Sequence, residues 1–357
     1  MTDLTTTPST SDALPLQAPS LPRYGTIFAV VFAIAVGALV SMVIGAGYVA
    51  ALVIAWLVLV VALPLWSLAI EGGRKAVDRV ATLLIWSTFG LAMIPLVSLI
   101  YTVVSKGSGI LSGQFFNNSM RNVLGEGGGI YHAIFGTLIV TALAAAISVP
   151  IGILTAIYLV EYGKGKKLAR VITFLVDVMT GIPSIVAGLF AYALFVLIFG
   201  PGVRLGIGGS VALSVLMIPI VVRSSEEMLK LVPDELREAS YALGVPKWRT
   251  IVKVVVPTAI AGIVTGVTLA IARVAGETAP LLIIAGFTTD TNLNPFSDRM
   301  TTLPVYIFQS IASPPGLYRQ EYEDYAWGAA LTLVTIVMLL NVLARVIGAV
   351  FAPKSGR

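Results

Sequence analysis

Two oppositely charged side chains stand inside a long apolar stretch toward the C-terminal end of the chain. Arg273 and Glu277 are four residues apart, a spacing that places both on one face of a continuous helix. If this stretch crosses a membrane, an unpaired arginine near its centre costs at least about 2.5 kcal/mol. The pair therefore either braces neighbouring helices as an internal ion pair or offers a positive group to an anion that crosses the membrane.

Other residues in apolar stretches could take part in the same chemistry. Arg223 stands where a second stretch ends, a position at which Lys and Arg are common membrane anchors. Asp177 lies within a third stretch, and we expect it to form a structural ion pair with a neighbouring cation or a hydrogen bond. Gly181 and Pro183 interrupt that stretch, either as a plain kink or as a break that exposes backbone groups to a passage. His132 has no His, Cys or acidic cluster nearby, and we interpret it as an interface residue at the outer surface, without chemistry.

Composition excludes several other kinds of site. The 357 residues include no Cys and a single His, which excludes a disulfide framework, an iron–sulfur cluster and a zinc or haem site built by this chain alone. Apolar residues make up 57% of the chain and charged residues only 11%, against about 45–50% and 25% in soluble domains. The composition therefore predicts a membrane protein.

The lengths of the apolar segments predict an all-α protein that crosses the membrane about eight times. A spanning helix needs about 20 predominantly apolar residues. The qualifying segments are approximately 26–45, 48–70, 80–104, 131–158, 171–199, 207–222, 258–284 and 326–350. The fifth is interrupted by Gly181-Ile182-Pro183-Ser184, so it is expected to kink, tilt or divide, and the sixth is short for a span.

The spans suggest a division of the chain into four parts. Residues 1–22 are rich in Ser, Thr and Pro, and Asp precedes any Lys or Arg, which argues against a secretory signal and predicts a disordered tail. Residues 23–75 are expected to form an additional transmembrane hairpin. Residues 76–350 hold the other six spans, and residues 351–357 form a C-terminal tail.

The distribution of positive charge predicts the orientation. With the N-terminus inside, 17 Lys and Arg residues fall in cytoplasmic segments and 5 in outer loops, as the positive-inside rule requires. Both tails are therefore expected in the cytoplasm. The net charge of +5 reflects membrane topology, and no base-reading motif indicates a nucleic-acid partner.

The loop of residues 223–257 is expected to form a helix, a turn and a second helix. Pro233 and the acidic residues after it are typical of a helix start, and Gly244 followed by Pro246 marks a stop and a restart. Leu236, Ala239 and Leu243 recur at spacings of three and four and so form one apolar stripe. Such a helix either lies on the lipid surface or docks against a partner.

A resemblance favours docking. Glu238-Ala239-Ser240, Gly244 and Val254-x-Val256-Pro257 resemble the EAA loop of ATP-binding-cassette (ABC) importer permeases, with Ser240 in place of the second Ala. The resemblance implies a type I importer permease core with a coupling helix that docks on a dimeric cytoplasmic ATPase. Its residues are Glu238, Ala239, Ser240, Leu243 and Gly244.

The nucleotide is expected on that partner. The chain contains no G-x4-G-K-[ST] sequence, the glycine-rich loop that cradles phosphates. We therefore expect no cofactor on this chain, and ATP with Mg on the ATPase. The chain itself is interpreted as a permease subunit and not as an enzyme.

A narrower resemblance concerns the substrate. Several runs are similar to the A-type permeases of phosphate-specific ABC transport systems, over about residues 80–350: Ala272–Leu282, Tyr131–Thr137, Ile157–Gly163, Asp177–Ser184 and Val222–Leu229. The resemblance implies a bacterial inner-membrane importer in which an external binding protein delivers phosphate to a channel between two homologous permeases. The hairpin of residues 23–75 departs from that six-span pattern.

The same resemblance implies roles for the charged residues. Arg273 is expected to contact or guide phosphate, Glu277 to restrain Arg273 and prevent tight retention, and Arg223 to be a second candidate for the passage. The alternatives are an ABC permease for another oxyanion, such as sulfate, molybdate or phosphonate, an ion-coupled secondary transporter, and a structural or sensory subunit.

Overall fold

The computed structural model describes residues 20–351, and in this range the regular secondary structure is entirely helical, without a β-strand. The predicted tails, residues 1–22 and 351–357, lie almost wholly outside the described residues. Contacts divide the chain into two compact units, Met1–Leu99 and Ile100–Arg357. This division falls inside a helix and differs from the predicted boundary after residue 75, so the extent of the permease domain stays a prediction.

The first unit begins with the predicted hairpin. Helix α1 (Gly25–Ile44) packs along α2 (Tyr48–Glu71), and the turn between them is closed by Gly45 with a φ of 73°. Every fourth residue of α1 is small and buried: Gly25, Ala29, Ala33, Gly37 and Ser41. A Cβ on Gly37 would lie 2.5 Å from the Ala51 carbonyl oxygen, so only glycine permits this approach.

A buried carboxylate closes the end of the hairpin. The Glu71 side chain is 2% exposed and accepts hydrogen bonds from the Leu21 N–H (3.0 Å) and the Ser67 hydroxyl (2.7 Å). It also pairs with Lys75 and Arg79 in the first turns of α3 (Gly73–Gly107). Helix α3 is longer than the predicted span of residues 80–104, because it starts directly after the turn at Gly72.

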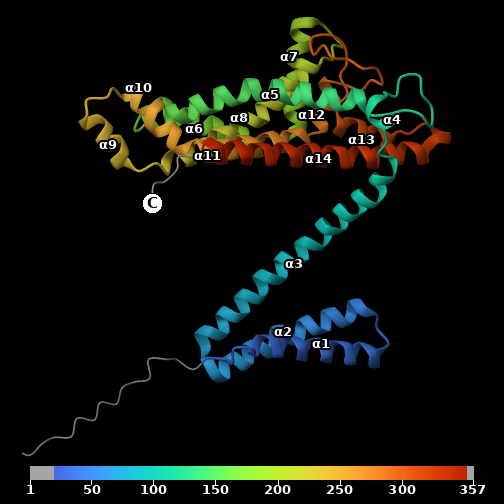
Figure 1. The fold of residues 1–357 in the computed structure, drawn as a ribbon, viewed down its shortest axis with the longest axis vertical. Coiled ribbons are helices and arrows are strands. Elements are labelled where there is room, and N and C mark those ends of the chain that lie inside the picture. The colour runs from blue at the N-terminus through green and yellow to red at the C-terminus, as the bar shows by residue number, and fades with distance from the viewer. Residues whose placement is uncertain (1–19, 352–357) are drawn as a thin grey trace, which may run out of the picture. The chain divides into compact units, whose positions relative to one another are not determined.

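Long helices side by side form the second unit (Figure 1). They are α5 (Tyr131–Ile157), α8 (Gly206–Lys230), α11 (Val256–Ala275) and α14 (Arg319–Phe351). The core between α5, α8 and α11 contains Val140, Ala144, Leu213, Met217, Ala270 and Val274, all at most 1% exposed. The close packing of this core depends on small residues, since a Cβ on Gly152 would lie 2.6 Å from a Val221 methyl group.

Short helices cap the two ends of this bundle. One end carries α4 (Gly113–Asn117), and α13 (Leu303–Ala312) packs on α14 and α5. The opposite end carries α9 (Asp234–Ala242) and α10 (Lys247–Thr250) (Figure 1). We call residues 231–255, which connect α8 to α11, the helical loop. The predicted helix, turn and second helix are thus confirmed, and Gly244 adopts the left-handed φ of 75° that the turn requires.

Two predicted spans are divided. The segment 171–199 forms α6 (Lys167–Thr180) and α7 (Ser184–Phe199), bent by 108° where Gly181 and Pro183 lie between them. The segment 258–284 forms α11 and the short α12 (Ala279–Ile284), so its prediction as one helix was wrong. Among the described residues, seven helices are long and apolar enough to cross a membrane, or up to eight if the bent pair counts as one span.

The sixth predicted span was too short. Helix α8 continues to Lys230, eight residues beyond the predicted end at 222. The continuation is amphipathic, with Ser225, Glu226 and Leu229 buried, and a hydropathy criterion misses it because four of its residues are charged. Arg223 consequently lies within α8 and not at its end.

Candidate functional site

The break between α11 and α12 decides the surroundings of Arg273 and Glu277. Arg273 lies in the last turn of α11 and is exposed, whereas Glu277 lies in the non-helical step and is half-buried. The helix ends at Ala275 with Gly276 as its C-cap. The two charged residues therefore do not share one helical face, and that prediction was wrong.

No intramolecular partner neutralises these two charges within the described part of the chain. Neither side chain forms a hydrogen bond or an ion pair with any residue between 20 and 351. An internal brace between Arg273 and Glu277 is thus not formed in this structure. The cation is free to interact with a group outside the chain.

Arg273 belongs to an exposed stripe on α11. Thr265, Leu269 and Arg273 are spaced by four residues and all face outward, while Ala270 and Val274 of the same helix are buried in the core. The stripe therefore faces away from the core of this chain. A helix face that combines a hydroxyl, an apolar side chain and an exposed cation is suited to line a passage.

The break between α6 and α7 lies next to a network of four charged side chains: Asp177, Arg223, Glu226 and Lys230. Asp177 of α6 forms an ion pair with Arg223 of α8, which confirms the expected cation partner. Arg223 Nη1 also donates to Glu226 Oε2 at 2.8 Å, and Lys230 Nζ lies 2.7 Å from Glu226 Oε1. The network is neutral overall and fastens α6 to α8. Arg223 is thus occupied by two carboxylates, unlike Arg273.

Glu226 was not singled out from the sequence as a site residue, although a signal for it exists. It stands three residues after Arg223 and four before Lys230, the spacings at which oppositely charged side chains meet on one helix. Its side chain is only 9% exposed, against 59% for Asp177. Glu226 is therefore the central acidic group of the network.

The segments that follow the two breaks pack against each other. Helix α7 contacts α12, and a Cβ on Gly188 would lie 2.5 Å from the Pro280 Cα atom. Gly181, by contrast, has a φ of −88°, and a Cβ there would meet only the Val178 carbonyl oxygen, at 3.5 Å. Close packing in this region thus depends on Gly188 and not on Gly181.

The predicted apolar stripe of the helical loop faces outward. Leu243 is 84% exposed and Leu236 41%, and Glu238 and Ala239 are exposed as well. The buried residues of α9 are Arg237 and Ser240. The predicted stripe therefore exists, but it does not pack on this chain, as expected for a helix that docks on another molecule.

Polar contacts hold the loop in shape. The Ser240 and Thr250 hydroxyls are 2.8 Å apart and join α9 to α10, and the Gly244 N–H donates to the Tyr241 carbonyl at 2.9 Å. Partial burial, together with the nearby Glu161 carboxylate, raises the pKa of the Tyr241 hydroxyl above its ordinary value. Tyr241 is therefore neutral near pH 7.

A buried ion pair in this loop was missed by the sequence reasoning. Arg237 of α9 pairs with Glu161 at 2.9 Å, and the two side chains are 11% and 5% exposed. The residues are 76 positions apart, a separation at which helical periodicity carries no signal. The predicted stripe of Leu236, Ala239 and Leu243 does not include Arg237, and the burial of Arg237 was not expected.

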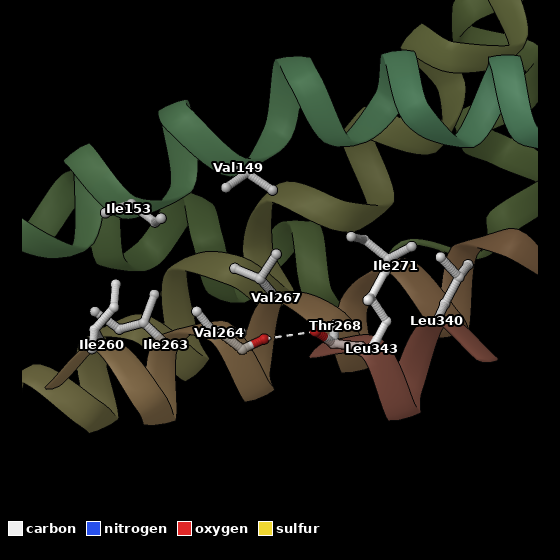
Figure 2. Close-up of a pocket in the computed structure, with 10 residues that line it drawn as sticks. All are labelled: Val149, Ile153, Ile260, Ile263, Val264, Val267, Thr268, Ile271, Leu340 and Leu343. Atoms are coloured by element: carbon white, nitrogen blue, oxygen red, sulfur yellow. Dashed lines mark hydrogen bonds between the residues drawn. The ribbon is translucent and has the colours of Figure 1, made fainter. Parts of the chain in front are cut away.

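The apolar cavity between α5, α11 and α14 is a poor site for an anion. It has a volume of about 290 Å³, and Figure 2 shows Val149, Ile271 and Leu340 among the aliphatic side chains around it. Thr268 contributes the hydroxyl group at the cavity, and it donates to the Val264 carbonyl at 2.8 Å. Among the residues that the structure describes, no charged side chain lines this cavity.

His132 differs from its expected place. It is 2% exposed and packs its ring edge-on against Tyr306, with centroids 5.5 Å apart. The prediction of a position at the surface was therefore wrong, because α13 covers the start of α5. Neither ring nitrogen has a hydrogen-bond partner within the described residues, and no group of three potential metal ligands occurs in that part of the chain.

Comparison with known proteins agrees with this architecture. Residues 148–357 match the family described as "Binding-protein-dependent transport system inner membrane component". Phosphate transport system permease protein PstA 1 of Mycobacterium tuberculosis (strain CDC 1551 / Oshkosh) is 47% identical over 279 residues, which are 77% of this chain and 89% of that protein. PstA of Yersinia pestis is 41% identical over 287 residues, or 80% and 93% of the two chains.

A solved structure shows the same fold. A chain of a bacterial alginate ABC transporter, solved in complex with an alginate pentasaccharide-bound periplasmic protein, superposes with a TM-score of 0.53 at 14% identity. The superposition covers 78% of this chain and 97% of that chain. The chain is thus a multi-pass membrane protein that belongs to the family of binding-protein-dependent transport system inner membrane components, with PstA phosphate permeases among its relatives.

Proposed function

We propose that this chain is a permease subunit of an ATP-driven phosphate importer and forms half of its translocation pathway. The observation that carries the proposal is the placement of Arg273 where a membrane helix breaks, exposed and without a partner among the described residues. The relatives named phosphate transport system permeases support the choice of substrate. Phosphate carries a charge between −1 and −2 near neutral pH and needs a positive group to offset its desolvation.

A single arginine suits passage better than a cluster. Arg273 stabilises the anion electrostatically in a region of low dielectric constant, while the carboxylate of Glu277, four residues on, limits how tightly the anion is held. Arg223 is the second candidate for the passage, but Asp177 and Glu226 already occupy its guanidinium group. We therefore assign the stronger contact with phosphate to Arg273, and to Arg223 mainly the attachment of α6 to α8.

The exposed stripe on α11 that carries Arg273 also favours the participation of a second permease subunit. Thr265, Leu269 and Arg273 face away from the chain's own core, so a passage along them needs a wall from another chain. A homologous permease subunit supplies that wall in this proposal. The substrate would then move between the two subunits and not through the core of this one.

The helical loop is the proposed docking surface for the ATPase. Two of its exposed apolar residues belong to the predicted stripe: Leu236 lies on α9, and Leu243 follows this helix directly, before the turn at Gly244. ATP and Mg are expected on a dimeric ABC ATPase, because the chain has no phosphate-binding loop. An external phosphate-binding protein is expected at the opposite end of the bundle, which carries α4 and α13.

This arrangement implies an orientation in the bacterial inner membrane. The helical loop and the turn before α6 are rich in Lys and Arg, and the positive-inside rule places them in the cytoplasm. The N-terminus is then cytoplasmic as well, because the hairpin of α1 and α2 returns the chain to the same side.

Phosphate uptake tests the proposal directly. Labelled phosphate is measured in phosphate-starved cells with and without this chain, in competition with sulfate and molybdate. Loss of phosphate uptake on deletion, restored by the chain and insensitive to the other oxyanions, is the expected result. Unchanged uptake in cells that lack a redundant importer contradicts the proposed substrate and favours another oxyanion. Membership of the family favours an ABC permease, for phosphate or for another oxyanion, over an ion-coupled secondary transporter.

A further inference from the structure

Glu161 receives contacts from both helices of the helical loop. It lies in a π-helical turn, Tyr158–Tyr162, which directly follows α5. Its carboxylate accepts hydrogen bonds from Arg237 of α9, and its backbone carbonyl accepts a hydrogen bond from Lys247 of α10. The helical loop is therefore fastened, from each side of its turn, to one residue of the π-helical turn that follows α5.

The geometry at Arg237 makes this connection rigid. Nε and Nη2 donate to Glu161 Oε1 at 3.0 and 2.9 Å, and Nη2 also donates to the Leu229 carbonyl at 3.0 Å. Nη1 donates to the Val232 carbonyl at 2.6 Å and to Asp234 Oδ1 at 3.1 Å. All five N–H groups of the planar guanidinium are thus used. The side chain joins α9 to the ends of both α8 and α5.

Stability alone is a weak explanation for this pair. Two buried charges lose their hydration, and an apolar pair of similar volume is often as stable or more stable. An oriented, fully bonded ion pair does provide a stiff link between elements that are far apart in the sequence. The helix α9 has few other contacts outside the loop, so the stiffness is located at this link.

The link leads toward the broken helix. Only Gly163–Lys166 separate the π-helical turn from α6, which carries Asp177 and ends at the bend before α7. We infer that Glu161 is a positioning residue that transmits displacement of the helical loop to the ends of α5 and α6. This inference rests on the proposed coupling of the loop to an ATPase.

The complete transporter in proteoliposomes tests this role. It consists of this chain, its partner permease and the ATPase, with the binding protein on the outer side, and ATP hydrolysis and labelled phosphate uptake are measured on the same vesicles. Glu161→Gln keeps the shape of the side chain but removes its charge. Phosphate imported per ATP is expected to fall at least about fivefold, the lower end of typical coupling between sites, while the complex still co-purifies.

Asp234→Asn is the matched control. Asp234 also accepts a hydrogen bond from Arg237, at 3.1 Å, but its side chain is 72% exposed. The Asp234→Asn variant is therefore expected to keep the wild-type ratio of phosphate imported per ATP. A merely structural role for Glu161 lowers the amount of complex, and with it hydrolysis and uptake together, without changing their ratio. An intact Glu161→Gln complex with the wild-type ratio would overturn the inference.

If the transporter with Glu161→Gln does not assemble, the Lys247→Met variant tests the role of Glu161 instead. Lys247 is exposed, so its replacement removes the second contact to Glu161 without leaving a buried charge. A lowered ratio supports the inference, and an unchanged ratio contradicts it. Wild-type vesicles that import no phosphate contradict the proposed function itself, whereas wild-type import beside an unchanged variant ratio contradicts only the role of Glu161.

Discussion

Gly188 of α7 packs directly on Pro280 of α12, at a distance that leaves no room for a side chain: a Cβ on Gly188 would lie 2.5 Å from the Pro280 Cα atom. This contact joins the helices that follow the two breaks. Because the neighbouring atoms belong to a backbone, neither helix can yield without moving as a whole.

Gly188→Ala is therefore expected to separate α7 from α12 and to lower both the thermal stability and the uptake activity of the purified transporter. Overpacking of this kind costs about 1–3 kcal/mol. Gly181→Ala is the control, because Gly181 has a negative φ and ample space, and it should unfold at the wild-type temperature. Equal melting temperatures for Gly188→Ala and the wild type would show that the contact is not as close as described.

Arg273→Gln is expected to abolish phosphate uptake or reduce it at least about tenfold, since a fully paired phosphate contact is worth about 1.5–3 kcal/mol. The side chain has no intramolecular partner within the described residues, so assembly with the ATPase should be unaffected. The measurement is labelled phosphate uptake, with co-purification of the ATPase as the check on assembly.

Arg170→Gln supplies the comparison for that experiment. Arg170 is also an exposed arginine of a membrane helix, in the first turn of α6, but it is remote in sequence from either break. Its uptake should match the wild type. Normal uptake by Arg273→Gln would remove Arg273 from the pathway.

Ala239→Asp places a charge in the exposed apolar stripe of α9 and is expected to prevent docking of the ATPase. Burying an unpaired carboxylate in an interface costs several kcal/mol, enough to lose the complex at micromolar concentrations. Co-purification and ATP hydrolysis stimulated by the binding protein are the measurements. Glu235→Gln, an exposed change in the first turn of the same helix, should leave both intact. A complex that survives Ala239→Asp would mean that the ATPase docks elsewhere.

The four-charge network predicts unequal effects for its two carboxylates. Glu226→Gln removes the common partner of Arg223 and Lys230 and should lower the free energy of unfolding by about 1–3 kcal/mol. Asp177→Asn, at a side chain that is 59% exposed, should change it by less than about 1 kcal/mol. Thermal unfolding of the two variants in the same detergent compares them, and a larger effect at Asp177 would contradict the central place of Glu226.

Local patterns were sufficient to predict the helical class, most of the spans and the helical loop. A run of about 20 apolar residues can bury its backbone polar groups in lipid only as a helix, which is why the hairpin of α1 and α2 was predicted within one or two residues. The turn at Gly244 was also predictable, because a left-handed residue between two helices is a local requirement.

Tertiary structure alone decided how the charged residues are used. Periodicity placed Leu236 and Leu243 on one stripe, but only packing showed that the stripe faces outward and Arg237 inward. Hydropathy predicted one continuous helix over residues 258–284. In the structure this segment breaks between α11 and α12, and the break separates Arg273 from Glu277. After the break, Pro280 of α12 packs on Gly188 of α7. The pairing of Arg237 with Glu161 joins residues 76 positions apart. Spacing along a helix determines which residues share a face, whereas the partner of that face depends on how distant helices pack.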